Sequence, residues 1–384
     1  MKVLLLILVS LIFFFPPKSF SYSGSSAKRH NVSKELDRIE KIIKLKREAL
    51  LKIQQHNKKE ERLYEKRFFS DKNNYRLLPS GLQKKDENIF LELFGQQAHI
   101  AFGFQRGYIK GHSTYLITFS GGASELEFPL DTHLLGVNCF LYYRNNSQVI
   151  SSERDRYRAR FTISWFKDIA HSGKLKDSDW IDGDGHPGKD IYSESSSGID
   201  LSILDLNYIY NVLFYKHVTI GWIAGYKYYK YRYDIYDTDQ KGYGPYHPTY
   251  TIYVPGPTLL YSVRYRFFYF GINSDIYLKD NFLLNFQFGY SPWVRSNDRD
   301  DHILRYKLSE AEGKGDAYFF NVNGIWNIIS HWHCRFGFEY AKIDTEGTQH
   351  QYFYAGPYMG LSTDVDDKIT SSYWLIFLSL NYLI

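Results

Sequence analysis

Beyond its N-terminal segment, the chain lacks any apolar run of about 18 residues, which excludes a bundle of membrane-spanning helices. Methionine and cysteine are scarce, with 2 residues of each among 384. Aromatic residues are abundant instead: 35 Tyr, 28 Phe and 7 Trp. This bias toward strand-forming side chains predicts an all-β protein. Cys139 and Cys334 lie far apart in strand-like segments, so we expect two packed thiols, although an oxidising compartment would also permit a disulfide.

The net charge of +5 does not describe the whole chain. Residues 31–67 hold 12 of the 47 lysines and arginines and 7 of the 42 acidic residues, so the remainder carries 35 of each. The basic excess therefore belongs to one segment, and nothing else in the sequence supports a nucleic-acid partner.

Residues 1–21 have the layout of a secretory signal peptide. Lys2 precedes the apolar run Val3–Phe15, and small residues follow at Ser19 and Ser21. The apolar run is too short for a comfortable membrane span, so we expect cleavage near Ser21, with Ser23 as the alternative, and export of the protein. A retained signal would instead tether the chain to the inner membrane.

Residues 22–94 are predicted to form a periplasmic helical extension followed by a linker. Within residues 32–64, apolar residues recur at alternating spacings of about four and three, namely Val32, Leu36, Ile39, Ile43, Leu50 and Ile53. Two interpretations fit this pattern: a single solvated amphipathic helix, or a coiled coil through which the protein self-associates or meets an envelope partner.

Residues 95–384 are predicted to form a ten-stranded antiparallel transmembrane β-barrel. In "NFLLNFQFGYSPW", the apolar residues alternate with small or polar ones, and "YWLIFLSLNYLI" at the C-terminus repeats the pattern. Similar runs give ten strands near residues 97–118, 123–144, 154–171, 198–213, 217–235, 257–277, 281–296, 315–329, 333–345 and 371–384.

Connection lengths favour the same architecture. Those after strands four, six and eight are short ("FYKH", "LKDN", "ISHW"), whereas those after strands three, five, seven and nine are long and polar. Short periplasmic turns and long outer loops are usual in outer-membrane barrels of Gram-negative bacteria. A soluble β-sandwich or lipocalin-like barrel also alternates, but here the second face is too polar to fill a soluble core.

Two acidic stretches are predicted to be outer loops that face each other across the barrel mouth. These are "KLKDSDWIDGDGHPGKD", after strand three, and "SNDRDDHILR", after strand seven. In a ring of ten strands, their positions are nearly opposite.

Together with "GIDLSILDLNY", "GWIAGYKYYKY" and "GYSPWVRSNDRDDH", the first stretch resembles the omptin family of outer-membrane endopeptidases over roughly residues 97–384. The resemblance implies an active site with an Asp-x-Asp pair on one wall and an Asp-x-His pair on the other. Carried over by position, these are Asp177 with Asp179, and Asp300 with His302.

The chemistry of these residue types agrees with peptide hydrolysis. Without a metal or a nucleophilic Ser or Cys, the reaction needs a base such as His302 to activate water, and Asp300 would orient the imidazole. Asp177 would hold the same water from across the gap. Because like charges resist joint ionisation, the pKa of Asp179 beside Asp177 is expected to be raised, which would let it donate a proton to the leaving amine or to the tetrahedral oxygen. The sequence does not divide these roles between the two aspartates.

The resemblance also implies cleavage near basic residues and activation by lipopolysaccharide; no other cofactor and no metal is expected. Asp298 matches one acidic specificity residue, but the other, a glutamate on the first strand, falls near Gly111 and His112 and is missing. Matching outward lipid-binding positions are Tyr226, Lys230 and Arg264, while Tyr228 replaces an expected acidic residue.

Other interpretations of these motifs stay open. Asp177, Asp179, Asp182 and Asp184 could form a weak calcium site, although their spacing is not that of an EF-hand. His331 and His333 could bind a metal, although packing beside Trp332 at a periplasmic turn is favoured. A porin or a surface adhesin of omptin ancestry is the alternative to a protease.

Overall fold

The computed structural model describes residues 98–143, 157–171, 173–181, 188–243, 249–279, 281–329 and 331–384. They form one 3-10 helix, η2 (Ile303–Arg305), and the strands β1 (Ala98–Phe119), β2 (Gly122–Pro129), β3 (Thr132–Tyr143), β4 (Ala159–His171), β5 (Lys174–Trp180), β6 (Ile191–Tyr215), β7 (Val218–Gly242), β8 (Tyr250–Lys279), β9 (Phe282–His302), β10 (Lys307–Ile329), β11 (Trp332–Phe353) and β12 (Ser362–Leu383). None of the described segments is a helix long and apolar enough to cross a membrane. The predicted signal peptide and helical extension lie outside the described residues.

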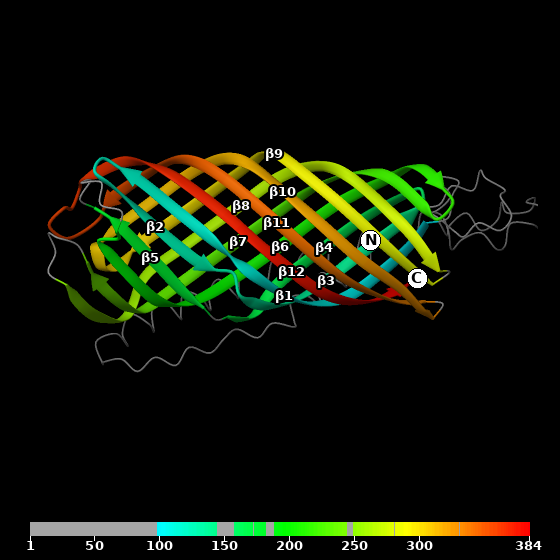
Figure 1. Cartoon of the computed structure of the whole chain (residues 1–384), viewed down its shortest axis with the longest axis horizontal. Helices are drawn as coiled ribbons and strands as arrows, with labels where there is room; N and C mark the ends of the chain where they lie inside the picture. The colour runs from blue at the N-terminus through cyan, green and yellow to red at the C-terminus, as the bar shows by residue number, and fades with distance from the viewer. Residues whose placement is uncertain are drawn as a thin grey trace, which may run out of the picture. The chain divides into compact units, whose positions relative to one another are not determined.

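The strands pair antiparallel in a closed ring, which confirms the predicted all-β barrel. The last strand, β12, pairs with β1, so the two lie side by side in Figure 1, in red and cyan. Closure leaves no unpaired sheet edge, as a lipid environment requires. Along β1 the partner changes from β3 to β2, and along β6 it changes from β4 to β5. β2 and β5 therefore continue β3 and β4, which makes ten strand positions around the ring.

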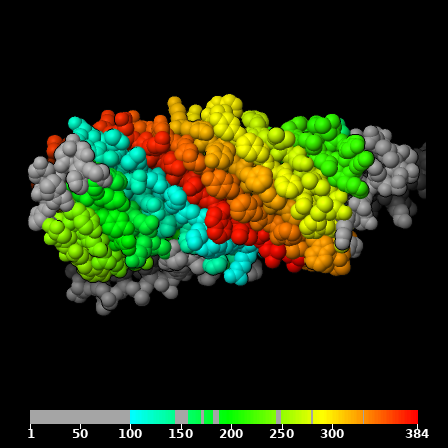
Figure 2. Space-filling view, viewed as in Figure 1, coloured from blue at the N-terminus to red at the C-terminus, as the bar shows by residue number. Residues whose placement is uncertain are grey.

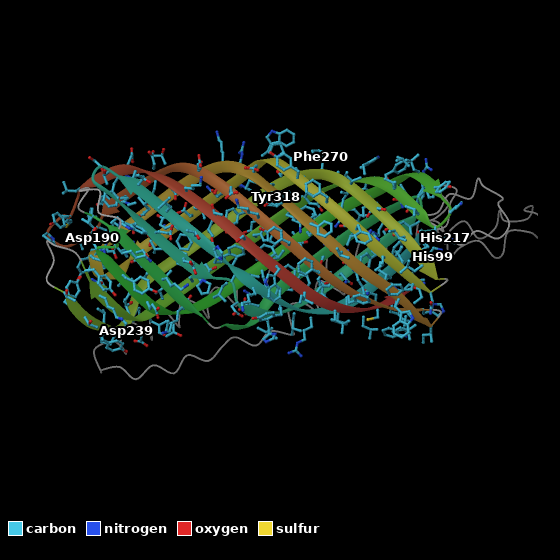
Figure 3. The ribbon with its side chains drawn as sticks, viewed as in Figure 1. His99, Asp190, His217, Asp239, Phe270 and Tyr318 are labelled. Carbon is cyan, nitrogen blue, oxygen red and sulfur yellow. The ribbon has the colours of Figure 1, made fainter. Side chains whose placement is uncertain are left out.

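Three tight turns close one end of the barrel, as their short connections predicted. They join the paired residues Tyr215 and Val218, Lys279 and Phe282, and Ile329 and Trp332. His99 and His217 lie at this end, and Asp190 and Asp239 lie at the other (Figure 3).

Outward-facing side chains divide the barrel wall into two halves. Residues 98–109, 132–143, 157–171, 204–228, 266–279, 281–294, 317–329, 331–342 and 373–384 form what we call the apolar half, whose outer surface carries exposed aromatic and aliphatic side chains; Phe104 is 79% and Trp293 64% exposed. Phe270 and Tyr318 project from it in Figure 3, and Figure 2 shows neighbouring strands packed side by side on one face of the barrel. Residues 110–129, 174–181, 188–203, 229–243, 249–265, 295–316 and 343–372 form the polar half, whose outer face carries charged residues. A soluble protein rarely exposes so large an apolar surface, whereas a membrane barrel requires it.

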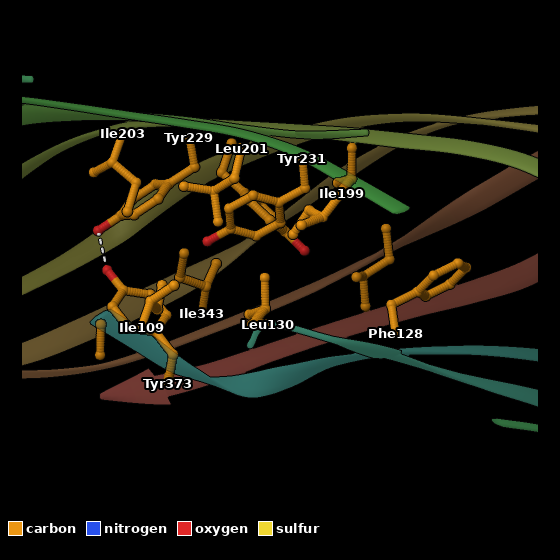
Figure 4. Packing of buried hydrophobic residues seen from close by; sticks show 14 of the residues in the cluster. Ile109, Phe128, Leu130, Ile199, Leu201, Ile203, Tyr229, Tyr231, Ile343 and Tyr373 are labelled. Carbon is orange, nitrogen blue, oxygen red and sulfur yellow. Dashed lines mark hydrogen bonds between the residues drawn. The ribbon is translucent and has the colours of Figure 1, made fainter. Parts of the chain in front are cut away.

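Side chains fill the lumen where the two halves meet. Lys227, which is 2% exposed, donates hydrogen bonds of 3.1 and 3.0 Å to the carboxylate of Glu339. The Tyr373 hydroxyl donates to Glu339 Oε1 at 2.9 Å and shares a 2.8 Å hydrogen bond with the Tyr229 hydroxyl, the contact dashed in Figure 4. Toward the polar end, Phe128 and Tyr231 are buried in the same cluster. The interior is thus packed with bulky and hydrogen-bonded groups.

The prediction that both acidic stretches are outer loops is wrong. "KLKDSDW" forms β5, hydrogen-bonded to β2 and β6, and Asp298–His302 complete β9 between β8 and β10. Where a strand extends beyond the lipid, its outward side chains need not be apolar. The alternation of apolar and polar residues that identifies a membrane strand is then lost, although the strand remains hydrogen-bonded to its neighbours.

Candidate active site

The first acidic pair projects inward from β5. Asp177 and Asp179 are two residues apart, so they lie on the same face of the strand. Asp179 is 7% exposed, and Asp177 is half-buried. Among the described residues, nothing is aligned to hydrogen-bond Asp177 Oδ1.

The second pair projects inward from β9. Asp300 is fully buried, and the side chain of His302 is 16% exposed. Asp300 Oδ2 lies 3.0 Å from His302 Nε2, an ion-pair distance, although neither oxygen of Asp300 has an aligned hydrogen-bond donor among the described residues. Asp300 is more deeply buried than His302, so the Nε2 edge of the imidazole, which lies against Asp300, faces the barrel interior.

The two walls are close enough to act on each other electrostatically. The pKa of Asp177 is raised to about 7, mainly by burial and also by the negative charges of Asp179 and Asp300. Arg305 and Lys307 act in the opposite direction. The fold therefore places Asp300 of β9 within electrostatic range of Asp177 of β5, and Asp177 itself can carry a proton near neutral pH.

Lys307 is a member of this cluster that the sequence did not reveal. It pairs with His302 across β9 and β10, faces inward and is 8% exposed. Burial lowers its pKa, whereas Asp300, Asp179 and Asp177 oppose that change. Its strand was predicted to begin at residue 315, and the inward alternation of Lys307, Ser309, Ala311 and Gly313 was the signal available for an earlier start.

Asp367 is a second unpredicted acidic group. It lies on β12, where it pairs with Ile117 of β1 and Gly347 of β11, and it is 4% exposed. The strand was predicted to begin at residue 371. Gly111 and His112, the positions expected for a first-strand glutamate, supply no carboxylate.

The three positions that the sequence predicted to bind lipid lie together on the outer surface. Tyr226 and Lys230 face outward on β7, and Arg264 on β8 is the register partner of Lys230. Tyr226 packs against Phe268, with ring centroids 5.1 Å apart. Among the described residues, no carboxylate forms an ion pair with Lys230 or Arg264, so both cations are available on the edge of the apolar half.

The remaining predicted positions make ordinary packing and hydrogen-bonding contacts. Cys139 and Cys334 are free thiols, as expected, on strands that are not neighbours. His331 Nδ1 lies 3.2 Å from the carbonyl oxygen of Leu383, and His333 is buried with its ring 6.2 Å from that of Phe140. Asp182 and Asp184 lie outside the described residues.

Comparisons with known proteins place the barrel in a family. The structure is similar to the outer-membrane protease OmpT from Escherichia coli, with a TM-score of 0.62 at 14% identity over 74% of this chain and 97% of that one. OprG from Pseudomonas aeruginosa matches with a TM-score of 0.32 at 8% identity over 75% and 97% of the two chains. The search of curated proteins gave no match. The model of the omptin family matches residues 157–350, just over half of the sequence. This chain therefore belongs to the omptin family and is an outer-membrane β-barrel.

Proposed function

We propose that the protein is an endopeptidase that hydrolyses exposed peptide bonds near basic residues at the polar end of its barrel. The proposal is supported by the electrostatic effect of Asp300 on Asp177, which puts the pair Asp300 and His302 near the pair Asp177 and Asp179 although their strands are nearly opposite in the ring. A buried cluster of carboxylates with perturbed pKa values is a hallmark of catalytic sites.

In the proposed reaction, a water molecule lies between His302 and Asp177. Because Nε2 faces Asp300, Nδ1 is left to accept the proton of the water as its oxygen bonds to the peptide carbonyl carbon. The C–N bond of the resulting tetrahedral intermediate then breaks. The leaving amine takes a proton from the Asp177–Asp179 pair, and His302 returns its proton to that pair, so that one water is consumed.

Lys307 is positioned to balance the negative charge that develops in this step. It is the register partner of His302 and acts electrostatically on Asp300, Asp179 and Asp177. A buried ammonium group stabilises an oxyanion more strongly than an exposed one, because water screens it less.

The outward trio supports activation by lipopolysaccharide. Lys230 and Arg264 would contact the phosphate groups of the lipid, and Tyr226 would rest at the boundary with its acyl chains. The packed lumen, with Lys227 bound to Glu339, speaks against the alternative of an open porin.

Cleavage of fluorogenic peptides with Arg-Lys or Lys-Arg bonds tests the proposal. The refolded barrel with lipopolysaccharide should cleave them, and His302→Ala and Asp177→Asn should each lose about 100-fold to 10,000-fold in kcat/KM. His350→Ala and Asp301→Asn are matched controls, since His350 and Asp301 face outward in exposed contacts with Asp364 and Tyr354. Undiminished cleavage in the His302 variant would refute the mechanism. A steady open-pore current in planar bilayers would support a porin.

A further inference from the structure

The first residues of β8 have a neighbouring strand on one side only. β8 begins at Tyr250 and pairs with β7 from there, whereas its pairing with β9 begins at Leu259. The ring is closed below this level, but residues Tyr250–Val254 extend beyond it toward the polar end. Among the described residues, no strand pairs with their side that faces away from β7. We call Tyr250–Val254 the free edge.

The backbone of the free edge directs unpaired groups toward its open side. On β7, the N–H of Tyr243 donates to the carbonyl oxygen of Asp190 at 2.6 Å, in the direction of β6. Successive residues of a strand direct their backbone groups to opposite sides, so Gly242 faces β8 and pairs with the first residue of the free edge. Continuing this alternation along β8, Thr251 and Tyr253 direct both their N–H and their C=O groups away from β7.

The composition of the free edge favours pairing with another strand. After Tyr250 come Thr251, Ile252, Tyr253 and Val254, all of residue types that are common in strands. Ile252 is 51% and Tyr253 58% exposed. Proteins usually prevent unwanted pairing at an exposed edge with proline or lysine, and the free edge contains neither.

The residues between the free edge and the ring are blocked instead. Pro255 and Pro257 have no N–H group, and the N–H of Gly256 already donates to Asp237 Oδ1 at 2.9 Å. Pairing along this side of β8 is therefore interrupted beyond Leu259 and becomes possible again only at the free edge.

The free edge lies on the continuation of β9, which ends at the candidate site. His302 is the last residue of β9 and the register partner of Leu259, and η2 then leads into β10. A strand paired with the free edge would thus follow the line that β9 follows lower in the wall. From Leu259 to Tyr253 the extended chain covers about 20 Å. A peptide whose cleaved bond lies at His302 therefore reaches the free edge with residues about four to eight places from that bond.

We propose that the free edge binds an extended segment of the substrate as an additional antiparallel strand. The proposal rests on the proposed peptidase function. Antiparallel pairing with β8 gives the added strand the direction of β9, so its N-terminal end is nearest His302. The bound segment is therefore the part of the substrate that follows the cleaved bond. Thr251 and Tyr253 exchange backbone hydrogen bonds with every second residue of it. The substrates are thus polypeptides with about eight extended residues after the cleaved bond.

A scan of N-methylated peptides tests this proposal on the unmutated protein. Each substrate has one Arg-Lys bond followed by ten residues, and a single N-methyl group is moved along that segment. Because N-methylation removes one donor, kcat/KM should fall about threefold to tenfold at every second position about four to eight places after the bond, and little at the positions between. A uniform effect throughout the segment, or no effect beyond the cleaved bond's immediate neighbours, would overturn the proposal.

A binding measurement separates this proposal from that of a peptidase. In the His302→Ala background, Tyr253→Pro removes an edge N–H and should weaken binding of the unmethylated peptide about threefold to tenfold more than Tyr253→Ala, which removes only the side chain. Heat-modifiable gel migration confirms the fold of each variant. Binding with this difference, without any cleavage by the unmutated protein, would sustain the free edge as a binding site and refute the peptidase. Cleavage with equal binding by the two variants would do the reverse.

The alternative occupant of the free edge is a second copy of this chain. Sedimentation of the detergent-solubilised barrel should show a monomer, both with and without Tyr253→Pro. A dimer that Tyr253→Pro dissociates and Tyr253→Ala does not would assign the free edge to self-association and overturn the proposal.

Discussion

Buried charges are treated differently in the two halves of the barrel. In the apolar half, near its junction with the polar half, Lys227 lies 3.0 Å from Glu339 and 3.6 Å from Asp205. In the polar half, Asp298, Asp300 and Asp367 are equally buried, yet none has a hydrogen-bond donor aligned on every oxygen. The first network stabilises the protein by itself, whereas the second is left for a partner to complete.

Removing one member of the compensated network should produce the largest loss of stability. Lys227→Met leaves Glu339 buried without its cation and should cost about 3–5 kcal/mol. Denaturant unfolding followed by gel migration measures this change. The double variant Lys227→Met, Glu339→Leu should regain much of the loss. If the single variant is as stable as the unmutated barrel, the two halves do not differ as described.

Neutralising one of the buried carboxylates of the polar half should have the opposite effect and increase the stability of the barrel. Since the pKa of Asp298 is raised to about 9, the folded state retains a proton that the unfolded state releases near pH 4. Stability should therefore be greatest at low pH and fall as the pH rises toward 9. Asp298→Asn should remove this decline and be more stable at pH 9 by at least about 1 kcal/mol. Parallel stability–pH curves for both proteins would contradict the description.

A substitution at the boundary between the two halves should have a smaller effect, this time on lipid binding. Arg264→Ala should weaken binding to vesicles containing lipopolysaccharide by about 1 kcal/mol, roughly fivefold, because each surface cation contributes about that much. Arg299→Ala is the control, since Arg299 already pairs with Glu310 at 2.6 Å. Co-sedimentation at low and high salt measures both. Equal losses for the two variants would show that the patch has no special role.

The smallest effect concerns the charges around Asp177. Arg305 lowers the pKa of Asp177, so Arg305→Gln should raise it. If ionised Asp177 holds the reactive water, the acid limb of the kcat/KM profile should move to higher pH by a few tenths of a unit. If the acid limb stays in place or moves to lower pH, it does not report the ionisation of Asp177.

The sequence predicted the apolar half well because lipid imposes a strict alternation on it. The segments around Phe286 and Ile376, the tight turns and the inward phase of β9 all follow from that pattern. The polar half was harder to predict. Its outer face meets water and its inner face holds acids, so both faces are polar and the strand period is lost.

The candidate site residues also differ in whether the sequence could predict them. Asp177, Asp179, Asp300 and His302 were predicted from their motifs. Lys307 and Asp367 were not predicted, because "RYKLSEAEG" and "TDVDDKIT" read as loops, and because only the closed ring brings β10 and β12 near the candidate site. Residues contributed by strands distant in sequence carry no local signal.

Closure of the ring by the first and last strands has a consequence for how the protein matures. Since β12 pairs with β1, an unfinished barrel has the motifs of β5 and β9 but not the closed ring that makes their strands face each other. Under the proposed function, the site would therefore become complete only with the final strand, after export and insertion.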